Sequence, residues 1–144
     1  MPRITRSALV MFSAEQMFRL VNDVHAYPEF LPGCVGSRVH ETGEDYMMAS
    51  VDVAKAGIAK TFTTRNLLDA NRAIKMELVE GPFSKLAGWW TFTPLDVDAC
   101  KVEFDLDFEF TSKLIELAFG QIFRDLVGSM VLAFSNRAKV VYGV

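Results

Sequence analysis

Hydrophobic residues recur at spacings of three and four along the C-terminal part of the chain, from Ser112 to Tyr142. This spacing places them on one face of an α-helix, which has about 3.6 residues per turn. The apolar stripe consists of Phe119, Phe123, Val127, Met130, Phe134 and Ala138. A helix of this kind needs a large apolar partner, and its aromatic side chains predict either a thick core or the roof of an apolar cavity.

Apolar and charged residues alternate in the segment before this helix, from Ala99 to Phe110. A period of two predicts a β-strand with one buried face and one face in solvent. Phe104, Leu106 and Phe108 are then expected to be buried, whereas Glu103 and Asp105 face solvent. Further strands are predicted between clusters of turn-forming residues, at Arg3–Phe12, Val35–Glu41, Tyr46–Lys55, Ile58–Leu68, Ala73–Val79 and Leu86–Thr93.

Two short helices are predicted between the first and second strands. Ser13 is a good N-cap for an amphipathic helix over Ala14–Val21. A second short helix over His25–Phe30 has Pro28 near its start, and Pro32 stops it.

This order of elements predicts an α+β fold with one domain over residues 1–144. The short, hairpin-like connections make the sheet antiparallel. A strongly twisted sheet of about six to seven strands then curls around the C-terminal helix, with the two short helices near the N-terminus. This is the helix-grip arrangement.

Composition narrows the classes of function. The chain has 144 residues, 51% of them hydrophobic, with 12 Phe and a formal net charge of -3. A general binder of phosphate backbones needs a basic surface, so the charge argues against that class. A local basic set remains, and it is expected to be either solvated surface or a patch for an anionic partner on the convex face of the sheet: Lys55, Lys60, Arg65, Arg72 and Lys75.

The reactive residue types form no catalytic or metal-binding pattern. Cys34 and Cys100 lack metal-ligand spacing and are expected to be reduced thiols in the cytoplasm. His25 and His40 match no metal or nucleophile signature, and we interpret them as solvent-exposed or capping residues. No leader segment is expected at the N-terminus, and the charges within Leu114–Phe134 make that stretch a poor membrane span. The chain is therefore not expected to be an enzyme.

Alternation within two predicted strands points to a candidate binding face. Leu86, Gly88 and Trp90 share one side of a strand, where Gly88 either leaves a gap in the wall or marks a bend. Thr64 and Asn66 lie among apolar residues of another strand. Their hydroxyl and amide either hold a carbonyl-bearing ligand or satisfy neighbouring backbone groups or a buried water.

Three motifs carry a resemblance to a known family: Asp23 to Pro32 (DVHAYPEFLP), Thr63 to Asn66 (TTRN) and Glu80 to Phe92 (EGPFSKLAGWWTF). Together with the terminal helix, they resemble the coenzyme Q-binding START-domain family, related to polyketide cyclases and lipid transport proteins. That family includes bacterial RatA-type ribosome-association toxins. One position departs from the pattern, because this chain has Gly33 where the family usually has Trp.

The resemblance implies a START/Bet v 1-like fold and, first, non-enzymatic binding of ubiquinone or a related isoprenoid lipid. It offers a second function, a RatA-type toxin that binds the large ribosomal subunit and blocks subunit association, and a third, a polyketide cyclase-like enzyme. For the first function, the expected ligand-binding residues are Tyr27, Phe30, Leu31, Phe62, Thr64, Asn66, Phe83, Leu86, Gly88, Trp90, Phe123, Val127 and Met130. The space between Trp90, Phe62, Phe123 and Val127 is expected to be incompletely filled.

The partners expected from this reading are a hydrophobic quinone or lipid and, for the toxin function, the large ribosomal subunit. No metal and no cofactor other than the quinone is expected. We expect a monomer in the bacterial cytoplasm, or in peripheral contact with the inner membrane.

Overall fold

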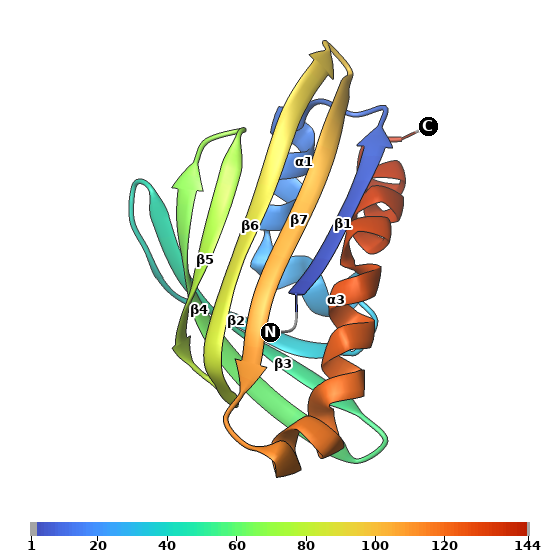
Figure 1. The fold of residues 1–144 in the computed structure, drawn as a ribbon. Helices are drawn as coiled ribbons and strands as arrows, with labels where there is room; N and C mark the ends of the chain where they lie inside the picture. Colours follow the sequence, from blue (N-terminus) through green and yellow to red (C-terminus); the bar gives the residue numbers. More distant parts are fainter. Residues whose placement is uncertain (1–2, 144) are drawn as a thin grey trace.

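The computed structural model describes residues 3–143 and shows one antiparallel sheet bent around a long helix (Figure 1). The sheet has seven strands: β1 (Arg3–Val10), β2 (Cys34–Thr42), β3 (Tyr46–Lys55), β4 (Ile58–Asp69), β5 (Ala73–Glu80), β6 (Phe83–Asp96) and β7 (Ala99–Phe110). The helices are α1 (Ala14–Asn22), the 3₁₀ turn η1 (Val24–Ala26), α2 (Tyr27–Phe30) and α3 (Lys113–Val141). The strand order β1-β7-β6-β5-β4-β3-β2 confirms the predicted helix-grip fold.

The stripe on α3 forms the centre of the core. Ser112 caps the helix, since its hydroxyl accepts a hydrogen bond from the Ile115 N–H at 3.2 Å. All six predicted stripe residues are buried, and so are Phe104, Leu106 and Phe108 on the facing side of β7. The length and composition of α3 would also suit a membrane span, but nine of its residues are buried against the rest of the chain.

The short N-terminal helices close the side of the sheet next to α3. Ser13 and Gln16 form a complete capping box at the start of α1, with reciprocal hydrogen bonds of 3.1 and 2.9 Å. Phe18 of α1 packs edge-on against Phe92 of β6, with ring centroids 5.8 Å apart. The predicted second helix is present but divides into η1 and α2.

Strand β6 is longer than the sequence predicted. It was expected to end before Pro94, but it continues to Asp96, with Pro94 opposite Cys100 of β7. Pairing between β6 and β5 reaches only Thr91, so at Pro94 the edge of β6 on the β5 side has no neighbouring strand. Because proline has no backbone N–H, it is tolerated at this position, where no acceptor on β5 needs a donor. At the other end of β6, a register shift between Phe83 and Lys85 allows Phe83 and Leu86 both to be buried.

Two turns depend on backbone conformations that favour glycine. The β3–β4 hairpin turns at Ala56 and Gly57, with φ of 53° and 83°, which confirms the predicted tight turn. Gly33, before β2, has φ of 86° and its carbonyl accepts a hydrogen bond from the Ala54 N–H. A tryptophan would be strained in this backbone conformation.

Phe134 offers a direct test of the role of α3. It is fully buried, and its ring contacts those of Tyr27, Phe30 and Trp90 at centroid distances of 5.3, 5.1 and 5.3 Å. Phe134→Ala is expected to lower the free energy of unfolding by about 3–5 kcal/mol in urea denaturation. Leu132→Ala, on the same helix but 65% exposed, is the control and should change it by less than about 1 kcal/mol. Equal losses in the two variants would contradict this packing.

Candidate functional site

A cavity of about 50 Å³ lies between α3 and the inner face of the sheet. Strands β3 to β7 form its walls, α3 its roof, and α1, η1 and α2 one end. The space between Trp90, Phe62, Phe123 and Val127 is therefore incompletely filled, as predicted. Sites for drug-sized ligands usually measure about 300–1,000 Å³. In this conformation the cavity admits only very small molecules, so it would have to enlarge to bind a quinone.

Most of the predicted site residues meet at this cavity. They come from α2, β4, β6 and α3, and the walls they form are mainly apolar. The members that line the cavity are Tyr27, Leu31, Phe62, Thr64, Asn66, Leu86, Trp90, Phe123, Val127 and Met130. Their role in ligand binding stays a prediction.

Two predicted aromatic residues lie outside the lining. Phe30 is half-buried on α2 and packs against Phe134 on the outer side of the cavity. Phe83 is buried behind Phe62 and Phe123, with its ring centroid 4.8 Å from that of Phe123. Both rings support the walls from behind instead of facing the empty space.

The gap suggested at Gly88 is filled. A Cβ at this position would lie 2.9 Å from Leu106 Cδ1 and 3.6 Å from Met76 Sδ. Leu106 therefore occupies the space that a side chain at position 88 would need. Gly88 permits close packing between β6 and β7, and the β6–β7 register is regular at this point.

Thr64 and Asn66 supply a polar spot on the otherwise apolar wall. Both are buried on the inner face of β4, and the Thr64 hydroxyl donates to Asn66 Oδ1 at 2.9 Å. The pair thus satisfies part of its own hydrogen-bonding capacity, while both residues still line the cavity. The Asn66 amide N–H groups are available to an acceptor, such as a carbonyl oxygen, that enters the cavity.

The α2 segment forms a cover over one end of the cavity. Tyr27 faces inward, and its hydroxyl donates to the Val21 carbonyl. On the outside, Arg137 of α3 is 3.2 Å from Glu29 and its guanidinium lies over the Phe30 ring at 5.1 Å. These contacts attach α2 to α3, so a larger opening at this end requires them to separate.

The cavity offers little acid–base chemistry. Among the lining residues that the structure describes, only Tyr27 carries a titratable side chain. Burial, together with the nearby Cys34 and Asp23, raises the pKa of Tyr27 well above its usual range. Tyr27 therefore keeps its proton near neutral pH, and that proton is engaged by the Val21 carbonyl.

Sequence reasoning missed part of the lining. These residues are apolar and come mainly from the other strands and helices: Val21, Val24, Ala49, Val51, Ile74, Met76, Phe104, Leu106 and Leu126. Phe104 and Leu106 were predicted to be buried, but periodicity cannot distinguish a residue that borders a cavity from one in a filled core.

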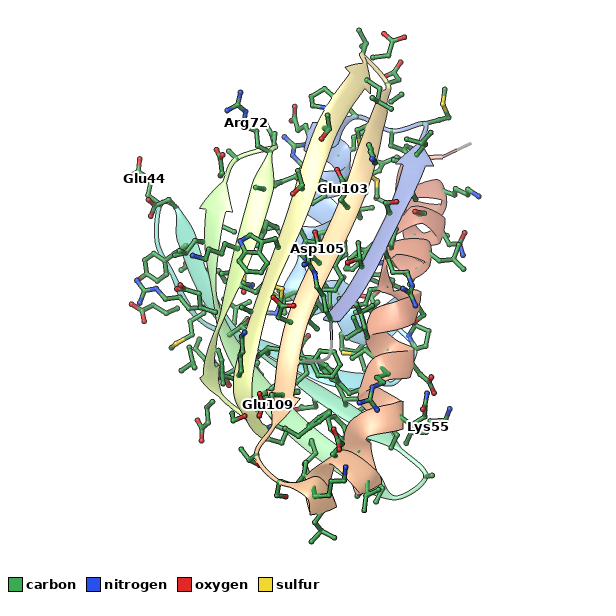
Figure 2. All side chains as sticks on the ribbon, in the orientation of Figure 1. Glu44, Lys55, Arg72, Glu103, Asp105 and Glu109 are labelled. Carbon is green, nitrogen blue, oxygen red and sulfur yellow. The ribbon has the colours of Figure 1, made fainter. Side chains whose placement is uncertain are left out.

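The five cations do not form one patch on the convex face, so of the two alternatives expected from the sequence the structure favours solvated surface. Figure 2 shows Lys55 beside α3 and Arg72 at the opposite end of the sheet. Lys60 pairs with the buried Val53 and alternates with Phe62 and Thr64, which places it on the inner side of β4. Arg65 and Lys75 do lie on the convex side, where Arg65 stacks over Tyr46 and Lys75 is 3.8 Å from Glu77.

Comparison with known proteins supports the fold and finds relatives with named functions. Residues 10–135 match the family described as polyketide cyclase/dehydrase and lipid transport. The ribosome association toxin RatA of Vibrio cholerae (El Tor Inaba) is 65% identical over 143 residues, covering 99% of both chains. A mitochondrial coenzyme Q-binding protein COQ10 homolog from Xenopus laevis is 28% identical, covering 96% of this chain and 59% of that protein.

A solved structure shows the same architecture. The solution structure of the 18 kDa protein CC1736 from Caulobacter crescentus is 30% identical and has a TM-score of 0.76. The alignment covers 100% of both chains. The curved sheet and long helix are thus shared along the whole length of the chain.

A larger side chain at position 127 tests whether the cavity is empty space that can accept additional atoms. Val127→Phe directs a ring into the cavity and is expected to change the free energy of unfolding by less than about 1 kcal/mol. Val102→Phe is the control, because Val102 is equally buried but does not line the cavity. Overpacking there should destabilise by about 1–3 kcal/mol in urea denaturation. Equal destabilisation by both substitutions would show that the region around Val127 is ordinary filled core.

Proposed function

The chain belongs to the polyketide cyclase/dehydrase and lipid transport family, and we propose that within this family it is a RatA-type ribosome-association toxin. In this role it binds the large ribosomal subunit and blocks subunit association. The observation that carries the proposal is the 65% identity, over 99% of both chains, to a protein named ribosome association toxin RatA. This identity reverses the order suggested by the sequence motifs alone, which placed quinone binding first. A ribosomal role also accords with a cytoplasmic location.

The geometry is compatible with a function performed by the outer surface. The cavity is small and covered, so a large partner must be bound by exposed side chains. The β3–β4 hairpin presents Lys55 and Lys60, and neither is among the ion pairs of the described residues. Unpaired lysines at a hairpin end suit contact with ribosomal RNA phosphates. We therefore assign the hairpin as part of the ribosome contact.

Co-sedimentation with purified ribosomal subunits tests this function. The parent protein is expected to pellet with large subunits, and binding should weaken as salt increases because phosphate contacts release counterions. The double substitution Lys55→Glu/Lys60→Glu should reduce binding at least tenfold at the same salt concentration.

The control is Lys75→Glu, because Lys75 lies on the convex face next to Glu77 and away from the hairpin. This variant should bind almost as well as the parent. If the parent protein stays in the supernatant at low salt, the ribosome proposal is wrong. If both charge variants bind like the parent, the hairpin assignment alone is wrong.

A second candidate function is binding of a hydrophobic ligand in the cavity. It is supported by the buried Thr64–Asn66 pair, which offers amide donors within an apolar lining, and by the distant COQ10 relative. A quinone carbonyl could accept from Asn66, while burial of prenyl carbons would contribute about 0.8 kcal/mol per CH₂. The cavity must enlarge to admit the ring, and the α2 cover is the expected point of opening. A cyclase-like activity gains no support from a lining in which only Tyr27 titrates.

Titration with decylubiquinone tests the second candidate. In a Trp89→Phe background, Trp90 in the cavity wall is the remaining tryptophan, and its fluorescence should be quenched saturably. Asn66→Leu should weaken binding about three- to tenfold, the equivalent of one lost hydrogen bond of roughly 0.5–1.5 kcal/mol. Asn136→Leu, at an exposed position on α3, is the matched control and should bind like the parent. Quenching that never saturates, or that is unaffected by Asn66→Leu, would contradict a carbonyl site at Asn66.

A further inference from the structure

A second hollow, of about 550 Å³, runs between β1 and α3. It is lined by every residue from Arg6 to Phe12 and by Gly128, Val131, Leu132, Ser135 and Lys139 of α3. Figure 1 shows β1 at the border of the sheet, directly beside α3. We call this hollow the β1–α3 groove. It shares no lining residue with the central cavity and is therefore a separate site.

The lining shows that the groove follows the edge of a strand. Successive side chains of a strand point to opposite faces, so a hollow on one face would be lined by every second residue. The uninterrupted run through β1 therefore places the groove along its backbone edge. Within residues 3–143, β1 pairs with β7 alone, so its other edge carries backbone N–H and C=O groups without strand partners.

The chemistry of the groove is apolar and positive. Leu9, Met11 and Leu132 are 73%, 78% and 65% exposed, which is unusual for residues of this size when they gather on one surface. Arg6 and Lys139 are the only charged residues of the lining that the structure describes.

Arg6 is held at the strand edge. Its Nη1 donates to the Thr5 carbonyl at 2.9 Å, and its guanidinium packs beside Gly128 of α3. A Cβ on Gly128 would lie 3.4 Å from Arg6 Nη2, which shows how closely the guanidinium approaches the helix. The cation is thus positioned between strand and helix, at the side of the groove.

We propose that the β1–α3 groove binds an extended segment of a partner protein, one that carries acidic and apolar residues in alternation. The segment adds to the sheet as a strand beside β1, through the free backbone groups. Its carboxylates meet Arg6 and Lys139 on the side next to α3, and its apolar side chains on the other face cover Leu9 and Met11. The positive charge of the lining favours an acidic partner over a second copy of the chain. Two-fold pairing of two copies would bring two Arg6 and two Lys139 side chains together, and their repulsion would not be offset by any carboxylate of the lining.

The test uses a fluorescein-labelled pentapeptide, Glu-Val-Thr-Val-Glu, and the full chain. Fluorescence anisotropy should show saturable binding, and backbone amide shifts in NMR spectra should concentrate at Arg6–Phe12 and in the facing part of α3. A Lys-Val-Thr-Val-Lys peptide should bind at least tenfold more weakly. A peptide with N-methyl groups at every position should lose binding, because neither of its edges can then pair with the strand edge.

Charge variants locate the site. Arg6→Glu and Lys139→Glu should each weaken binding of the acidic peptide at least fivefold. Lys85→Glu, an exposed lysine of β6 outside the groove, is the control and should have no effect. Urea denaturation of each variant verifies that the fold is retained.

Three results would overturn the proposal. In the first, the acidic, basic and N-methylated peptides bind equally, or none binds. In the second, a single-stranded RNA oligonucleotide displaces the peptide and binds more tightly, which would make the groove a nucleic-acid site. In the third, sedimentation shows a dimer that Arg6→Glu disrupts, which would make the groove a self-association surface.

Discussion

Burial of the apolar stripe of α3 inside the curve of the sheet is the interaction on which the rest of this structure depends. Phe119, Phe123 and Phe134 are at most 1% exposed, and each ring contacts other aromatic rings of the core. Apolar burial contributes roughly 25 cal/mol per Å², so a helix of this length supplies a large part of the stabilisation. Ser112 caps the first turn of α3, and the other end is attached to α1 by the Tyr142 hydroxyl, which donates to the Gln16 carbonyl at 3.2 Å.

The same packing explains how one fold can serve different functions. Aromatic rings fill the space under α3 except for about 50 Å³. The size of a few side chains therefore decides whether this space is a filled core or a ligand site. A more open cavity would be needed for the proposed lipid ligand, whereas the proposed ribosome contact uses the outer surface. Lys55 of the β3–β4 hairpin and the β1–α3 groove both lie beside α3.

The helices and strands could be predicted because their apolar residues follow periods of two or of three and four. The N-caps at Ser13 and Ser112 could also be predicted, since capping depends on a few neighbouring residues. The extent of β6 could not, because Pro94 is tolerated only where β5 has ended. The distribution of the five cations over the surface could not be predicted for a similar reason. Strand register and sheet curvature, which separate Lys55 from Arg72, arise from contacts between distant segments.

The candidate site was predictable only in part. Most expected residues line the cavity, because alternation and motifs identify the inner face. Its small volume depends on how Leu106 packs beside Gly88 and how Phe83 supports Phe62, and no local pattern describes those contacts. The β1–α3 groove joins residues 6–12 to residues 128–139, so only the folded chain brings it together.

The most direct test of the toxin function is subunit association measured by light scattering. Purified small and large ribosomal subunits are mixed with magnesium in the presence of increasing amounts of this protein. Formation of complete ribosomes is expected to decrease with protein concentration, and preincubation with large subunits is expected to be more effective than preincubation with small subunits. Unchanged association at protein concentrations well above those of the subunits would contradict the toxin function.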